Sequence, residues 1–114
     1  MKRKFIETKG FRESSEKAGG DEVLRSIQNS ILKNPEAGAT VAGTGGVRKL
    51  RAMDLEANKG KRGGHRVIYL DLPRAQITIL LVLYGKKDKA DLTAAEKKAI
   101  YELVGRIKKE AGES

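Results

Sequence analysis

Two strongly apolar segments on either side of a proline constrain this fold more than any other feature. His65–Leu72 is apolar on both predicted faces, and Ala75–Tyr84 contains the longest apolar run, interrupted after Ile77 only by Thr78. Runs of this kind are typical of strands that are buried on both faces. Pro73, within Asp71–Arg74, favours a turn between them. We therefore expect the second segment to be a central strand.

Two shorter segments complete the predicted sheet. Lys4–Glu7 fits an edge strand, and Val47–Met53 fits a strand that mixes cations with apolar residues; Glu36–Gly46 fits a loop. The order strand, two helices, three strands and helix predicts an α+β fold. The fold is expected to be a small antiparallel sheet with N-terminal helices and a C-terminal helix. With 114 residues and no internal repeat, residues 1–114 are expected to form a single domain.

The helices are predicted from capping residues and apolar spacing. Phe11–Ala18 fits a short helix that stops at a Gly-Gly pair, and Asp21 is the expected N-cap of the next helix. That helix ends at Asn34, because a residue before proline disfavours helical geometry. Its expected apolar stripe is Leu24, Ile27, Ile31 and Leu32. The last helix has a capping box, Thr93 with Glu96, and the stripe Ile100, Leu103, Val104 and Ile107.

Positive charge is concentrated in one part of the chain. The formal net charge is +9, and Gly43–Lys87 alone holds ten Lys or Arg against three acids, a net of 10 − 3 = +7. Glycines lie among these cations and β-forming runs lie between them. This pattern predicts a sheet that presents a basic, phosphate-binding surface.

Composition excludes several classes of function. The chain has no cysteine and one histidine, which excludes a disulfide framework, a zinc-thiolate site and a multi-histidine metal site. Thr44 stands where a Walker motif needs lysine, and no dinucleotide-binding glycine pattern lies between a strand and a helix. No carboxylate pair accompanies the cations, which disfavours a two-metal nuclease. We expect no metal and no cofactor.

The sequence also indicates where the protein acts. The N-terminal segment MKRKFIETKG lacks the apolar region of a signal peptide, and the longest apolar run is too short to span a bilayer. No predicted helix opposes a basic face to a broad apolar one, which disfavours a membrane partner. We expect a cytoplasmic protein.

A site made of Arg and Lys can still act chemically on RNA. RNA carries its own nucleophile, the 2′-hydroxyl, so fixed guanidinium groups need only bind and neutralise the phosphate. A basic strand face is nevertheless more often a binding surface than a catalytic one. The sequence offers no obvious general base.

Three motifs together resemble a known family. GTGGVRKLR (43–51), GKRGGHRVIYL (60–70) and ITILLVLYGKKDKADL (77–92), followed by an amphipathic helix, resemble the RelE/ParE superfamily of bacterial toxins, most of all its HigB-type branch. The resemblance covers about residues 3–110, in the same order and spacing. It implies the RelE-like microbial RNase fold and a type II toxin that inhibits translation by cutting mRNA at the ribosomal A site. It also implies a cognate antitoxin, expected to bind DNA, and binding to ribosomal RNA.

The resemblance implies roles for particular residues. Arg66 would contact the scissile phosphate, and Arg51 and Lys86 would complete the catalytic set. Strand alternation puts Lys49 and Arg51 on one face and Arg48 on the other. The expected RNA-binding residues are Arg48, Lys49, Lys59, Lys61, Arg62, Tyr84 and Lys87.

Other polar and small residues have competing interpretations. Tyr84 either stacks on mRNA or ends its strand with its hydroxyl in water. His65 should point away from Arg66 and is more plausibly structural or solvent-exposed than a general base. Tyr69 is expected in the core and Tyr101 at the edge of the last helix's stripe. Gly45 and Gly46 serve a turn or a close approach to phosphate.

Two other functions remain open. A ParE-like toxin would poison gyrase through protein contact, although such toxins usually lack this cluster of cations. A non-catalytic RNA- or DNA-binding module needs only the charge, but 4% aromatic residues give few surfaces for base stacking.

Overall fold

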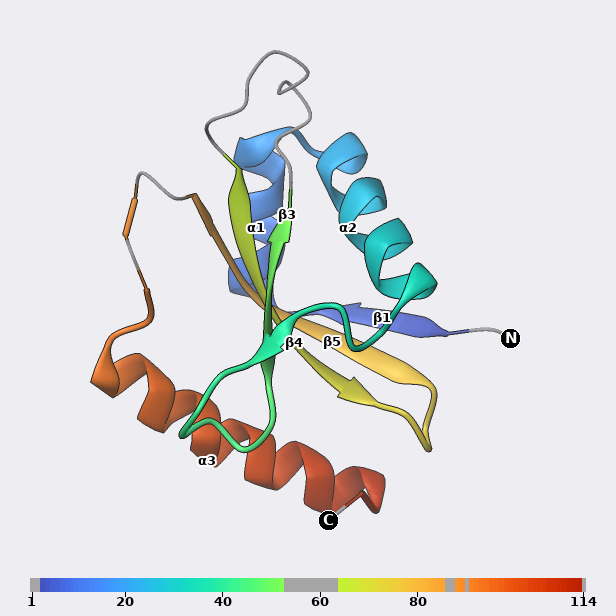
Figure 1. Ribbon diagram of the computed structural model, residues 1–114, viewed down its shortest axis with the longest axis vertical. Helices are drawn as coiled ribbons and strands as arrows, with labels where there is room; N and C mark the ends of the chain where they lie inside the picture. The colour runs from blue at the N-terminus through green and yellow to red at the C-terminus, as the bar shows by residue number, and fades with distance from the viewer. Residues whose placement is uncertain (1–2, 53–63, 86–87, 90, 114) are drawn as a thin grey trace.

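The computed structural model describes residues 3–52, 64–85, 88–89 and 91–113, which form a five-stranded sheet with three helices (Figure 1). The strands are β1 (Lys4–Glu7), β2 (Ala39–Thr40), β3 (Arg48–Ala52), β4 (His65–Leu72) and β5 (Ile77–Gly85). The helices are α1 (Lys9–Ala18), α2 (Asp21–Lys33) and α3 (Ala94–Ala111). The predicted α+β class is confirmed. The predicted strand end at Met53 lies outside the described residues.

β5 and β4 are the central strands of the sheet. The strand order is β1-β5-β4-β3-β2, and the pairs among β5, β4, β3 and β2 are antiparallel. The edge strand β1 pairs with β5 in parallel, which corrects the expectation of a wholly antiparallel sheet. This pairing is possible because two helices and three strands separate β1 from β5, so no hairpin fixes their relative direction.

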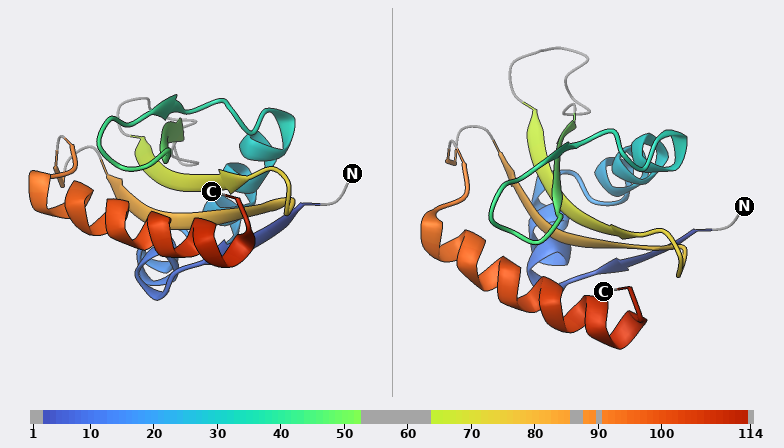
Figure 2. Two further views of the ribbon diagram at one scale, coloured as in Figure 1. Left: turned by 90° about the horizontal axis from the view of Figure 1, so that it is seen from below. Right: turned by 60° about the horizontal axis from the view of Figure 1, so that its bottom comes forward.

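Both faces of the sheet are covered by helices (Figure 2). On one face, α1 and α2 bury Phe11, Ile27 and Ile31 against Val67 and Leu80. On the other face, Ile100 and Val104 of α3 pack against β4 and β5. Burial on both faces explains why β4 and β5 are apolar at consecutive positions.

The predicted ends of α2 are partly correct. It ends at Asn34 as expected, but its N-cap is Gly20, and Asp21 is the first helical residue. A carboxylate there still interacts favourably with the helix dipole. The buried stripe is Val23, Ile27 and Ile31, while Leu32 is 49% exposed. The i, i+4, i+8 spacing of these three residues turns Leu32 away from the sheet.

The β4–β5 hairpin turns later than predicted. Pro73 lies in the turn, but the turn continues to Gln76, whose φ of 59° is left-handed, so β5 begins at Ile77 rather than Ala75. The Gln76 amide donates to the Pro73 carbonyl at 3.2 Å. The end of α3 meets this turn, where a Glu113 carboxylate oxygen accepts from the Ala75 amide at 2.9 Å.

The start of α3 agrees with the sequence. The Thr93 hydroxyl accepts from the Glu96 amide at 3.1 Å, and Glu96 accepts from the Thr93 amide at 2.8 Å. This confirms the capping box. Ile100 and Val104 are buried and Leu103 is partly buried, which confirms the apolar stripe.

Tyr69 fastens the segment between α2 and β3 to the sheet. Its ring is fully buried, as predicted, and its hydroxyl donates to the Pro35 carbonyl at 2.8 Å and accepts from the Gly38 amide at 3.0 Å. Burial raises the pKa of this phenol. A Cβ on Gly38 would lie 2.8 Å from the Lys49 carbonyl oxygen and 3.1 Å from the Tyr69 ring. The short β2 lies within the segment that was predicted as loop.

We expect Gly38→Ala to lower the free energy of unfolding by about 1–3 kcal/mol, because a methyl group there overlaps the β3 backbone. Chemical denaturation followed by circular dichroism measures the change. Gly105→Ala is the matched control, since a Cβ at this helical position meets nothing within 4 Å. The control should gain up to about 1 kcal/mol from helix propensity. Equal effects of the two substitutions would contradict the close approach at Gly38.

Candidate functional site

The register of β3 and β4 places three cations on one face of the sheet. Lys49 lies opposite Ile68, whose side chain packs on the α3 side, and Arg51 lies opposite Arg66. Directly opposed residues of an antiparallel pair point to the same face. Lys49, Arg51 and Arg66 therefore share the α3 side, which we call the basic row. The predicted alternation of β3 is confirmed.

Arg51 and Arg66 form a like-charge pair across two strands. Like charges directly opposite each other destabilise a sheet. In the part of the chain that the structure describes, neither guanidinium group makes a hydrogen bond or an ion pair to a protein side chain or backbone group. Arg51 is exposed and Arg66 is half-buried. Such a pair is suited to bind an anion with two oxygens, because each guanidinium can donate two parallel hydrogen bonds.

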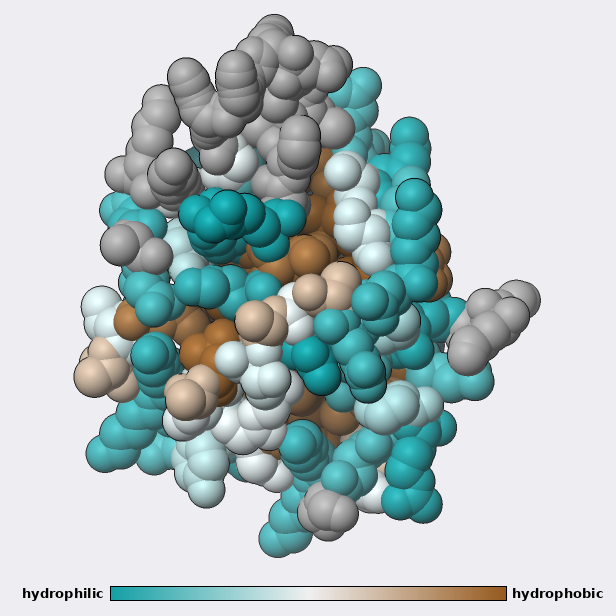
Figure 3. Space-filling model, viewed as in Figure 1, coloured by the Kyte–Doolittle hydropathy of each residue, from teal (hydrophilic) through white to brown (hydrophobic). Residues whose placement is uncertain are grey.

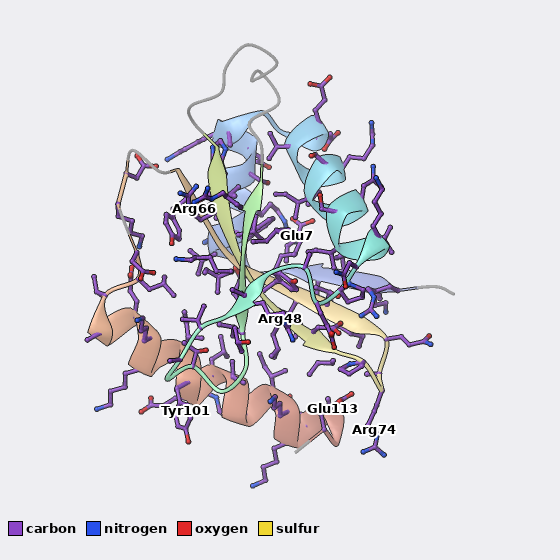
Figure 4. All side chains as sticks on the ribbon, viewed as in Figure 1. Glu7, Arg48, Arg66, Arg74, Tyr101 and Glu113 are labelled. Carbon is purple, nitrogen blue, oxygen red and sulfur yellow. The ribbon has the colours of Figure 1, made fainter. Side chains whose placement is uncertain are left out.

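Helix α3 leaves this end of the sheet open. It packs over the later part of β4, at Ile68, Leu70 and Leu72, whereas Arg66 lies nearer the beginning of the strand. Figure 4 shows Arg66 far from α3, toward the opposite end of the molecule. In Figure 3, hydrophilic side chains lie in this region and over much of the rest of the visible face. The apolar stripe of α3 therefore packs away from Arg66.

Tyr84 lies beside Arg66 but is not a free stacking platform. It is the register partner of Arg66 on β5, and only 6% of its surface is exposed. The ammonium group of Lys89 lies 5.1 Å from the centre of its ring. Its hydroxyl is buried and has no hydrogen-bond partner among the described residues, which contradicts the expectation of a hydroxyl in water. Burial, and secondarily the charge of Asp91, raise the pKa of this phenol.

The structure adds a carboxylate that the sequence did not predict. An Asp91 carboxylate oxygen lies 3.4 Å from the Lys49 ammonium nitrogen, although 42 residues separate them. Asp91 therefore lies near β3, although β4 separates β5 from β3 in the sheet. Lys89 lies two residues before Asp91 in the same connection. Its ammonium nitrogen is 2.6 Å from a Glu96 carboxylate oxygen. Asp91 directly precedes the Leu92-Thr93 cap, but sequence spacing alone gives no sign of its approach to Lys49.

Arg48 lies on the opposite face and holds the backbone. Its register partner is Tyr69, on the α1 and α2 side. Its guanidinium donates to the Gly38 carbonyl at 2.7 Å and to the Glu36 carbonyl at 3.4 Å. Arg48 was predicted to bind RNA, but its position separates it from the basic row.

His65 also lies away from the basic row, as predicted. Its register partner is Gly85, and it lines a hollow against α1 with Ser14, Lys17 and Asp88. Its Nδ1 is buried and has no hydrogen-bond partner in the described structure. This position agrees with the expectation that His65 is not the general base for a phosphate at Arg66.

The glycine-rich loop before β3 packs against α3. Gly45 has a φ of 84° and lies against Tyr101 and Val104, and its carbonyl accepts from the Lys108 ammonium group at 2.8 Å. Tyr101 lies beside the apolar stripe of α3 with 57% of its surface exposed. The loop precedes β3, whereas Arg51 is near the end of that strand. The structure therefore supports the turn role of the Gly-Gly pair.

Several predicted site residues are not placed. The predicted catalytic Lys86 and the predicted RNA-binding residues Lys59, Lys61, Arg62 and Lys87 lie outside the described residues. Within the described ranges, no group of three or more His, Cys, Asp or Glu side chains could hold a metal ion.

No helix among the described residues is long and apolar enough to cross a membrane. No protein-family model matches the sequence.

The two arginines of β3 should differ in their effect on stability. Arg48→Ala should lower the free energy of unfolding by about 1–3 kcal/mol, because a charged donor to two backbone carbonyls is lost. Arg51→Ala should leave stability unchanged or slightly higher, because it relieves the repulsion with Arg66. Denaturation with urea measures both values.

If the basic row binds RNA, Arg51→Ala should weaken RNA binding more than Arg48→Ala. Arg51→Ala should weaken binding and reduce the slope of log affinity against log salt by about one unit, as expected for one lost phosphate contact. Arg48→Ala, measured where it is folded, should keep the wild-type slope. A larger loss of binding for Arg48→Ala than for Arg51→Ala would contradict the assignment of the basic row.

Proposed function

We propose that this chain is the toxin of a type II toxin–antitoxin system, an endoribonuclease that cuts translated mRNA at the ribosomal A site. The observation that carries the proposal is the alignment of Arg51 with Arg66, beside Lys49, on the open part of the sheet. It is supported by the resemblance of the three sequence motifs to HigB-type toxins. Every residue of the basic row falls in one of those motifs.

The basic row fits the electrostatic demands of RNA cleavage. Attack of the 2′-oxygen on phosphorus adds negative charge to the non-bridging phosphate oxygens. Arg51 and Arg66 can donate hydrogen bonds to those oxygens, and cationic donors placed where negative charge develops stabilise the transition state. The repulsion between the two arginines in the free protein is relieved when a phosphate binds between them. No metal is required for this role, because the guanidinium groups themselves supply the charge.

The surroundings of the site fit a large partner. In this role, a ribosome would provide the remaining contacts that position the mRNA on the basic row. Part of the affinity for ribosomal RNA is expected to be electrostatic and therefore sensitive to salt. Within this proposal the protein acts in the cytoplasm and is neutralised by a cognate, DNA-binding antitoxin.

We expect induced expression of the wild-type protein to produce new mRNA 5′ ends within translated codons. Arg66→Ala should lower the cleavage rate by about 10²–10³-fold, the usual effect of removing one preorganised donor to a developing anion. Sequencing of mRNA 5′ ends after a short induction measures the cuts. Purified ribosomes that carry a short mRNA then give the rate directly.

Arg74→Ala is the matched control. Arg74 is an exposed arginine in the turn between β4 and β5, at the other end of the sheet from Arg66 (Figure 4). Its removal changes the net charge equally and should leave cleavage unchanged. Intact mRNA with growth arrest and DNA breaks would instead identify a gyrase poison. RNA binding without cleavage or growth arrest would identify a non-catalytic binding module.

A further inference from the structure

The carboxylate of Asp91 is the acidic group that contacts the basic row. One oxygen accepts a hydrogen bond from the Leu92 amide at 2.7 Å and lies 3.4 Å from the Lys49 ammonium nitrogen. These contacts come from two different parts of the fold, the start of α3 and strand β3. They fix the carboxylate while 51% of its side chain is exposed, so it can still meet a ligand.

The segment that carries Asp91 also lies close to the strand position beside Arg66. The ammonium group of Lys89, two residues before Asp91, lies 5.1 Å from the centre of the Tyr84 ring, and Tyr84 is the register partner of Arg66. Lys49 and Arg51 are two residues apart on β3, roughly 7 Å along the strand. Lys49, Arg51 and Arg66 share one face, so the carboxylate beside Lys49 lies on the same face as the arginine pair. The role proposed below requires the 2′-hydroxyl to lie on the Asp91 side of a phosphate held by the arginines.

We propose that Asp91 is the general base of the RNA cleavage reaction, a role that rests on the proposed function. Its carboxylate accepts the proton of the 2′-hydroxyl as the 2′-oxygen forms a bond to phosphorus. The bond between phosphorus and the 5′-oxygen breaks, and the leaving 5′-oxygen takes a proton from water. Asp91 then returns its proton to water. The products are a 2′,3′-cyclic phosphate and a 5′-hydroxyl, with no net consumption of water or acid.

Other titratable groups near the row fit this role less well. His65 lies on the opposite face. Tyr84 has a buried hydroxyl and a raised pKa, so it is neutral and a poor proton acceptor in the resting site. Glu96 is held by Lys89 and by the cap of α3. Among the placed residues this leaves Asp91 as the carboxylate that is both beside the row and half-exposed.

The carboxylate of Asp91 is ionised at neutral pH and can therefore accept a proton. Its pKa is lowered, first by the hydrogen bond from the Leu92 amide and then by the Lys49 ammonium group. Its carboxylate contacts Lys49 of β3, and the charges of Lys49 and of Lys97 on α3 both favour the ionised form. The carboxylate stays ionised from about pH 8 to about pH 6, so cleavage should lack the fall expected for a histidine base.

Asp91→Asn tests the role because it removes the charge and keeps the oxygen that accepts from the Leu92 amide. On ribosomes that carry a defined mRNA, single-turnover cleavage is measured against toxin concentration. The maximal rate should fall by about 10²-fold or more, the usual contribution of a general base. The half-saturating concentration should stay equal or decrease, because a negative charge beside the phosphate is lost. Asp91→Glu should recover part of the rate.

Two controls separate this role from an indirect one. Glu102→Gln removes a negative charge from an exposed position of α3 and should leave the rate unchanged. In a Lys49→Met background, Asp91→Asn should still lower the rate by a similar factor. If Asp91 only orients Lys49, the second substitution adds nothing, and the proposal is wrong.

The remaining outcomes are also decisive. Equal maximal rates for the wild type and Asp91→Asn, with tighter binding, would make Asp91 a competitor of phosphate rather than a base. If the wild type cuts and Asp91→Asn cuts equally, only the role of Asp91 fails. If the wild-type protein cuts no ribosome-bound mRNA under any condition, the proposed function itself fails and the role of Asp91 fails with it.

Discussion

The antiparallel pairing of β4 with β5 is the interaction on which the rest of the structure depends. Every helix packs on these two strands, and β1 and β3 pair with their outer edges. The pairing contains a register shift: Ile68 lies opposite Val82, whereas Tyr69 lies opposite Leu80, so Leu81 is an extra residue. An extra residue in one strand reverses the faces of all residues beyond it.

This bulge determines the composition of the site. Between the bulge and the end of β5, Leu83 packs on the α1 and α2 side while Tyr84 packs on the α3 side. Without the extra residue, Tyr84 would point to the opposite face from Arg66. The bulge therefore brings the phenol beside the arginine, while Tyr69, on the other side of it, stays in the core and anchors Pro35 and Gly38. A bulge next to a functional site commonly re-aims a side chain in this way.

The parts of this fold that follow from local pattern were predictable from the sequence, and the parts that follow from distant contacts were not. Alternation along β3 was enough to place Arg51 with Lys49 and apart from Arg48, because a strand has a strict period of two. The cap at Thr93 is likewise local. The parallel pairing of β1 and the approach of Asp91 to Lys49 depend on the path of the chain between elements. No periodicity in the sequence encodes that path.

The site also shows why a local rule can fail where function is expected. Two arginines in direct register oppose the preference for opposite charges across a sheet, and β4 and β5 supply enough apolar burial to retain them. Asp91 forms an ion pair with Lys49 and so reduces the local excess of positive charge. Arg51 and Arg66 have no such partner among the described residues. If the fold required a neutral pair here, an acidic residue in place of Arg51, directly opposite Arg66, would provide it more directly. The acid lies beside Lys49 instead, so the two arginines keep their charge without a partner among the described residues, as the proposed function requires.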